Sequence, residues 1–165
     1  MTDWIDDYAK QLNERQRATN EQRRLTLLQG EIIAERGPQY FERFARSLQT
    51  LKREFDEKLG ASFREVSLSG TSAPVTLTAA SGSYAATLKA TPNIKAQQID
   101  LELRLTGPEY SGDPEKKFIR LLVDDENNLV ARYELTTFTD EGELASAVLK
   151  DALPRDFILR AIGRD

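Results

Sequence analysis

The 165-residue chain contains no cysteine and no histidine, and these two absences exclude much ordinary enzyme chemistry. A chain without cysteine has no disulfide framework, no thiolate nucleophile and no cysteine-bound zinc. A chain without histidine lacks the usual general base at neutral pH and the commonest metal ligand. The phosphate-binding P-loop, the G-x-G-x-x-G fingerprint and the G-x-S-x-G nucleophile elbow are also missing. We therefore expect a protein that is not an enzyme and that holds neither a cofactor nor a metal ion.

The sequence also has no run approaching the roughly 18 apolar residues that a membrane span needs. Its first residues, Met-Thr-Asp-Trp-Ile-Asp-Asp, have neither the basic start nor the apolar stretch of a signal peptide. The net charge is −4, and this whole excess lies in residues 61–165, which suits a nucleic-acid binder poorly. We expect a cytoplasmic protein whose partners are neither nucleic acids nor membranes.

Residues 3–36 have the composition of a helix, with many strong helix formers and no proline. Their apolar residues form two clusters at helical spacing, separated by residues 13–24, in which only Ala18 is apolar. The first cluster is Trp4, Tyr8 and Leu12, and the second is Leu25, Leu28 and Ile32. Residues 1–36 are therefore predicted to form an N-terminal helical extension. Its two apolar clusters are predicted to contact another chain.

The dipeptide Gly37-Pro38 predicts a helix break, because glycine suits the end of one helix and proline the start of the next. A second helix is predicted over residues 38–59, where apolar residues recur every three or four positions. These are Phe41, Phe44, Leu48, Leu51, Phe55 and Leu59. The spacing fits a coiled-coil dimer or packing on a sheet. We favour the sheet, which otherwise lacks a cover.

Beyond residue 60 the hydrophobic period changes to two, and the alternation is strongest over residues 99–105. Short turns such as Ser81-Gly82-Ser83 separate about six predicted strands within residues 63–138. Helices are predicted within residues 141–162, with Thr139 or Asp140 as a cap. The predicted fold class is α+β: an antiparallel meander sheet with one face covered by helices. This domain spans residues 38–165, and the helical extension precedes it.

Three charged segments are candidates for chemistry, and each has a structural explanation. Residues 124–128 offer metal-ligating oxygens but fail the EF-hand pattern, and Asp and Asn also suit a tight turn. Residues 10–24 have a net charge of +3 but no aromatic side chain for base stacking, so we favour a solvated helix. Six residues on late strands form either a mixed-charge surface, which we favour, or a carboxylate pair of the glycosidase kind: Asp100, Glu102, Arg104, Arg120, Arg132 and Glu134.

Lysine is the remaining candidate for acid–base chemistry, since a desolvated lysine can act as a base or nucleophile. Lys89, Lys95, Lys116 and Lys117 lie beside polar or loop residues in the sequence, so none is expected to be desolvated.

Three functions stay compatible with these observations. The first is a non-catalytic interaction or assembly module that self-associates or docks a protein partner through Trp4, Tyr8, Leu12, Leu25, Leu28 and Ile32. The second is a small-ligand or peptide binder that uses the sheet face or the crevice between helix and sheet. The third is a histidine-free hydrolase that works with carboxylates. The missing catalytic residue types favour the first.

Overall fold

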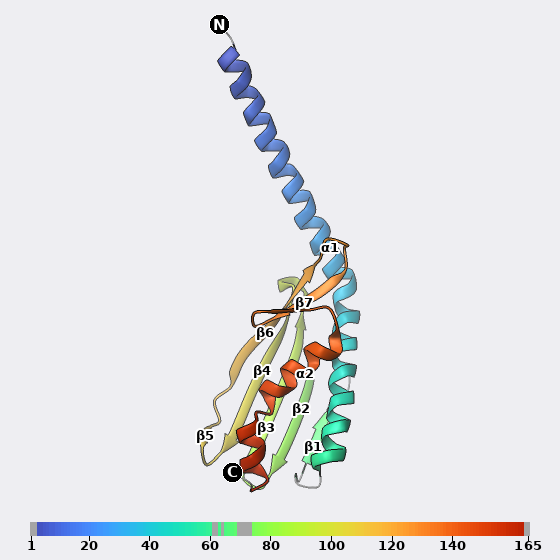
Figure 1. Cartoon of the computed structure of the whole chain (residues 1–165), viewed down its shortest axis with the longest axis vertical. Coiled ribbons are helices and arrows are strands. Elements are labelled where there is room, and N and C mark those ends of the chain that lie inside the picture. Colours follow the sequence, from blue (N-terminus) through green and yellow to red (C-terminus); the bar gives the residue numbers. More distant parts are fainter. Residues whose placement is uncertain (1–2, 61–62, 64, 69–73, 164–165) are drawn as a thin grey trace.

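The computed structural model describes residues 3–60, 63, 65–68 and 74–163. The described residues form three α-helices, eight strands and a short 3₁₀ helix (Figure 1). The helices are α1 (Asp3–Leu59), α2 (Glu141–Ala152) and α3 (Arg155–Ala161), and the 3₁₀ helix spans Ile94–Ala96. The strands are β1 (Glu65–Leu68), β2 (Val75–Ser81), β3 (Tyr84–Asn93), β4 (Gln98–Gly107), β5 (Tyr110–Ser111), β6 (Glu115–Val123), β7 (Leu129–Tyr133) and β8 (Thr136–Phe138). The predicted extension and domain each include two terminal residues that lie outside the described ones.

The strands form one antiparallel sheet in the order β1-β2-β3-β4-β6-β7-β8, with β5 paired to β4. This confirms the predicted α+β meander. The described residues contain more strands than the six expected, because β5 and β8 are too short to show a hydrophobic period. The predicted turn after β2 is present, and Gly82 adopts the left-handed φ of +57° that this tight connection uses.

One face of the sheet is covered by α1, α2 and α3, as Figure 1 shows. Phe41, Phe44 and Leu48 of α1 are buried in the main core with side chains of the sheet and α2. The apolar face predicted for residues 38–59 therefore packs on the sheet rather than on a second chain. Alternation with period two places the buried side chains of every central strand on this covered face.

The predicted helix break at Gly37-Pro38 is wrong, because α1 runs through both residues without interruption. Proline lacks the N–H that would bond to the carbonyl of residue 34, yet packing on both sides of it outweighs that loss. Gly37 has a different purpose: a Cβ there would lie 2.8 Å from Cδ1 of Ile94. The glycine lets α1 approach the segment between β3 and β4 closely.

The helices that follow the sheet begin and end close to the predicted positions. The Asp140 carboxylate caps α2 by accepting a hydrogen bond of 2.7 Å from the Gly142 N–H. Pro154 precedes the first residue of α3, which buries Phe157 in a second cluster with Phe63. Within the described residues, no helix is both long and apolar enough to cross a membrane.

The N-terminal part of α1 extends far beyond the sheet (Figure 1). Every residue from 3 to 29 is exposed, which corresponds to about 40 Å of helix at 1.5 Å per residue. Burial along α1 begins around Gly30 and is complete at Ile33. The predicted domain boundary at residues 36–38 remains a prediction, but the structure brings the core contacts forward to Ile33.

Candidate functional site

The first candidate is the exposed part of α1, residues 3–29, called the projecting segment below. It presents seven of the nine large hydrophobic side chains that are exposed among the described residues. Those seven are Trp4, Ile5, Tyr8, Leu12, Leu25, Leu27 and Leu28, and each exposes at least 43% of its surface. Of the predicted contact residues, five are exposed, while Ile32 is half-buried where the helix reaches the domain. The structure thus leaves both predicted clusters, apart from Ile32, exposed to solvent.

The projecting segment is helical for local reasons that need no tertiary contact. It contains neither glycine nor proline, and Arg24 and Glu21 form an i,i+3 ion pair of 2.7 Å. The helix also continues directly from the packed half of α1, so packing on the domain stabilises the first turns from which it can propagate. A helix anchored at one end in this way can hold its apolar clusters at fixed positions in solvent.

Charge is distributed unevenly along the projecting segment. Residues 3–14 carry four acidic side chains and one basic one, a net charge of −3. Residues 15–24 carry four basic side chains and one acidic one, a net charge of +3. These charged side chains are all exposed, so their electrostatic field acts mainly on molecules that approach the segment.

The second candidate is the face of the sheet that no helix covers, called the open face below. Here the predicted mixed-charge surface is present, because β4, β6 and β7 are neighbours. Glu102 pairs in register with Lys89 and Lys116, and Arg120 pairs with Arg132. The opposite charges around Glu102 stabilise such a face modestly without implying a function, whereas Arg120 and Arg132 repel each other.

Each carboxylate of the hydrolase interpretation has its own donor or cation. Asp100 accepts hydrogen bonds from the Gln98 and Asn93 side-chain amides at 2.5 and 3.3 Å. Glu102 lies 3.7 Å from the Arg104 guanidinium. Glu134 does not join them, because the chain turns at this residue with a φ of +56° and its carboxylate binds a lysine instead. No pair of carboxylates in this set has the shared apolar surroundings that a general acid requires.

Phe118 is the unexpected residue of the open face. The sequence places it at the start of an apolar run, yet it is 50% exposed, because Ile119 and Leu121 take the covered face. The Arg120 guanidinium lies 5.9 Å from the centre of its ring. Shallow grooves of about 510 and 330 Å³ share Phe118 and Lys116. The first also includes Arg120 and Arg132 and the carboxylates of Glu115 and Glu134, so it combines an aromatic ring with charges of both signs.

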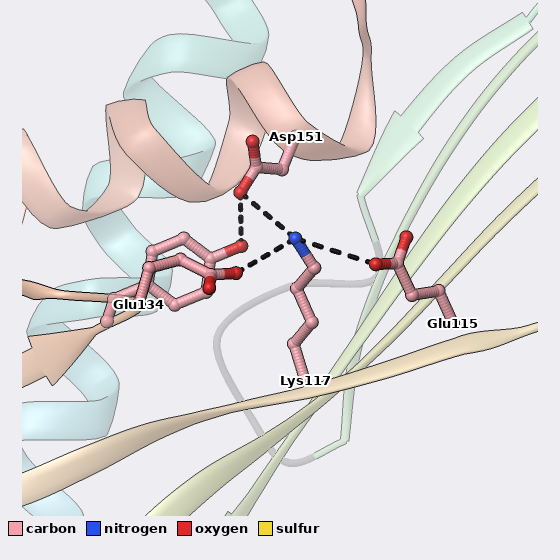
Figure 2. Close-up of polar contacts among 5 residues, drawn as sticks. Glu115, Lys117, Glu134 and Asp151 are labelled. Atoms are coloured by element: carbon pink, nitrogen blue, oxygen red, sulfur yellow. Dashed lines mark hydrogen bonds and ion pairs between the residues drawn. The ribbon is translucent and has the colours of Figure 1, made fainter.

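The third candidate is a cluster of charges around Lys117, at the margin of the covered face (Figure 2). The lysine ammonium lies 2.9 Å from Glu134, 3.5 Å from Asp151 and 3.6 Å from Glu115. The Tyr133 hydroxyl donates a hydrogen bond of 2.5 Å to the same Asp151 carboxylate. The cluster joins β6, the end of β7 and α2.

The expectation that no lysine is desolvated fails for Lys117, whose side chain is only 23% exposed. Burial by itself would lower the pKa of Lys117, but the carboxylates of Glu134, Asp151 and Glu115 outweigh it and the pKa is raised. Lys117 is therefore held as a cation, which suits a structural ion pair and not a nucleophile or base. Desolvation and the hydrogen bond to Asp151 likewise raise the pKa of the Tyr133 hydroxyl.

Residues 124–128 form a turn built by one carboxylate. Asp124 accepts hydrogen bonds from the backbone N–H groups of Glu126 and Asn128 at 3.0 and 2.8 Å. The Arg36 side chain donates to the Asn127 carbonyl, which ties this turn to α1. Within the part of the chain that the structure describes, no three acidic side chains converge as a metal site would require. The oxygen atoms of Asp124 stabilise the turn itself.

Comparisons with known proteins identify no relative of this chain. No family model, no curated protein and no solved structure matches the chain. The function is therefore inferred from the geometry of this chain alone.

Proposed function

We propose that this protein is a non-catalytic interaction or assembly module, and that it self-associates or docks a protein partner through the projecting segment. The observation that carries the proposal is the concentration of exposed apolar side chains in residues 3–29. Scattered exposed hydrophobics are normal on a protein surface, but large groups of them mark interaction sites. The rest of the described surface has only Phe118 and Leu135 in this class.

The energetics support a contact of moderate strength. Burying a half-exposed large apolar side chain contributes on the order of 1 kcal/mol. Two copies of the segment that bury about ten such side chains would gain about 10 kcal/mol, against an association cost of about 4–15 kcal/mol. At the low end of this cost the net gain is about 6 kcal/mol, so the expected dissociation constant for self-association is in the tens of micromolar.

The test is the mass of the protein in solution at high micromolar concentration, measured by light scattering. The triple substitution Leu25→Ser, Leu28→Ser and Ile32→Ser is expected to weaken the assembly by at least tenfold in dissociation constant. Leu27→Ser is the matched control, because Leu27 is 69% exposed but lies on another side of the helix. Circular dichroism checks that both variants stay folded. A full-length chain that is monomeric under these conditions would contradict the proposal.

A second candidate function is binding of a small ligand or peptide on the open face, and the observation in its favour is Phe118. Its ring lies in a groove of about 510 Å³ that is lined by four cations and by the carboxylates of Glu115 and Glu134. The resulting net charge of +2 favours a small anionic molecule. Native mass spectrometry of the protein as purified tests this candidate. A bound molecule that is lost in Phe118→Ser supports it, and an unliganded protein that binds no member of an anion library contradicts it.

A further inference from the structure

The two apolar clusters of α1 lie at similar distances on either side of Ala18, and we infer that residues 3–33 pair with the same residues of a second copy in antiparallel orientation, with the two-fold axis at Ala18. The inference rests on the proposed function, which it makes specific. In this register Trp4 lies against Ile32 of the second copy and Tyr8 against Leu28. Gln11 lies against Leu25, and Ala18 meets Ala18.

The register places Trp4 and Tyr8 of the first cluster against Ile32 and Leu28 of the second, while Leu25 faces Gln11. Each cluster lies at one end of the segment, with the polar residues 13–24 between them. A parallel pair would also stack each cluster on itself, so apolar matching alone does not decide the orientation. Charge decides it.

In a parallel pair the residues 3–14 of both copies meet, and each carries a net charge of −3. In the antiparallel pair these residues instead face residues 22–33, which carry two basic side chains and one acidic one, a net charge of +1. Repulsion between two acidic stretches becomes attraction between opposite charges. Arg15 is also brought opposite Glu21 of the second copy. The antiparallel pair is therefore the electrostatically favoured one.

The spacing of the contact residues suits two helices wound around each other. Trp4, Gln11, Ala18, Leu25 and Ile32 repeat every seven residues, which is the spacing of one of the two contact positions of a coiled coil. The second contact position is apolar only at Leu28, the other residues there being Asp7, Glu14 and Glu21, and Tyr8 contributes from the neighbouring position. On a straight helix a seven-residue repeat drifts by about 20° per heptad, or about 80° over the segment, and a left-handed supercoil removes the drift. The small side chain of Ala18 at the centre allows the two helices to approach closely. Leu12 lies at the margin of this contact.

The domain leaves room for the second helix. At 100° per residue, Leu25, Leu28 and Ile32 lie on the side of α1 away from Gly37, which is buried against Ile94. A second copy on that side passes beside the domain rather than into it. Figure 1 shows the projecting segment clear of every other element.

Disulfide trapping tests the orientation, because the chain has no cysteine and every cross-link must come from an introduced one. The variants are Gln11→Cys, Leu25→Cys and Ala18→Cys, each in the full chain and equilibrated in a glutathione buffer. In the antiparallel pair the Cα atoms of residue 11 in the two copies are about 21 Å apart, far beyond the roughly 7 Å that a disulfide spans. We expect Ala18→Cys to cross-link with itself. Gln11→Cys and Leu25→Cys are expected to cross-link only when they are mixed, and intact mass identifies the mixed dimer.

The outcomes separate this inference from the proposed function. If the chain without substitutions is dimeric and Gln11→Cys cross-links with itself as fast as in the mixture, the pairing is parallel; the antiparallel inference is then wrong while the assembly function stands. A dimer in which none of the three introduced cysteines cross-links also overturns the inference, because assembly then uses another surface. A monomer under all conditions overturns the proposed function as well.

Discussion

Removal of residues 1–29 and removal of residues 1–37 are expected to have very different effects on folding. Among the described residues, the first deletion takes away only exposed ones, whereas the second also takes away Ile33, which is 2% exposed and belongs to the main core. The first deletion removes every residue of the proposed assembly surface except Ile32, and the second removes them all. Neither shortened chain is therefore expected to dimerise, and their stabilities can be compared directly. The difference between them isolates the part of α1 that enters the core.

The size of the difference follows from the contacts. Losing a fully buried isoleucine side chain costs about 2–4 kcal/mol. Losing the exposed hydrogen bond from Arg36 to the Asn127 carbonyl adds about 0.5 kcal/mol. The free energy of unfolding should therefore be about 3–4 kcal/mol lower for the chain that begins at Pro38 than for the chain that begins at Gly30.

Urea unfolding followed by far-ultraviolet circular dichroism measures this difference. Fluorescence is unsuitable, because Trp4 is the only tryptophan and both deletions remove it. With a denaturant slope of about 2 kcal/mol per molar urea, the midpoint should fall by about 1.5–2 M. Equal midpoints would refute the assignment of Ile33 to the core. A chain from Gly30 that unfolds without cooperativity would show that the projecting segment is part of the folding unit.

Two further predictions concern single residues of the domain. Gly37→Ala should lower the free energy of unfolding by about 1 kcal/mol despite the better helix propensity of alanine, because the alanine Cβ would press on Cδ1 of Ile94. Adding Ile94→Val removes that Cδ1 atom and should restore the free energy of unfolding in the same urea assay. Lys117→Met should cost about 1 kcal/mol at neutral pH, because it removes the cation that three partly exposed carboxylates share. Because the pKa of Lys117 is raised in the folded chain, the stability that its charge contributes is present at neutral pH and is lost as the pH rises through that pKa. The difference in thermal unfolding temperature between wild type and Lys117→Met should therefore become smaller in strong alkali. A difference that does not change with pH would show that the variant loses packing rather than charge.

The sheet could be predicted from the sequence because its signal is local. The alternation of Ile99, Leu101 and Leu103 with charged residues specifies both a strand and the side of it that is buried. The helix through Gly37-Pro38 could not be predicted in the same way, because the dipeptide is a local signal for a break. Packing of α1 on residues far along the chain, such as Ile94, decides the outcome there.

The candidate sites also differ in whether local sequence spacing or strand register determines them. The apolar clusters of α1 could be found from spacing alone, since a helix turns a fixed spacing into a common face. The cluster around Lys117 depends on strand register, which places Lys117 opposite Leu101 on the covered face and beneath Asp151 of α2. Phe118 is exposed for the same reason, because it is opposite Asp100 on the other face. No local pattern specifies that register.

The central claim is that the projecting segment exists to bind protein, and the mass of the unmodified chain in solution tests it most directly. Light scattering over a range from low to high micromolar concentration should show a rise from 18.6 kDa toward twice that mass. The rise should be absent in the chain that begins at Gly30, which keeps the whole domain. A mass that stays at 18.6 kDa at every concentration, or a rise that persists without residues 1–29, would contradict the account.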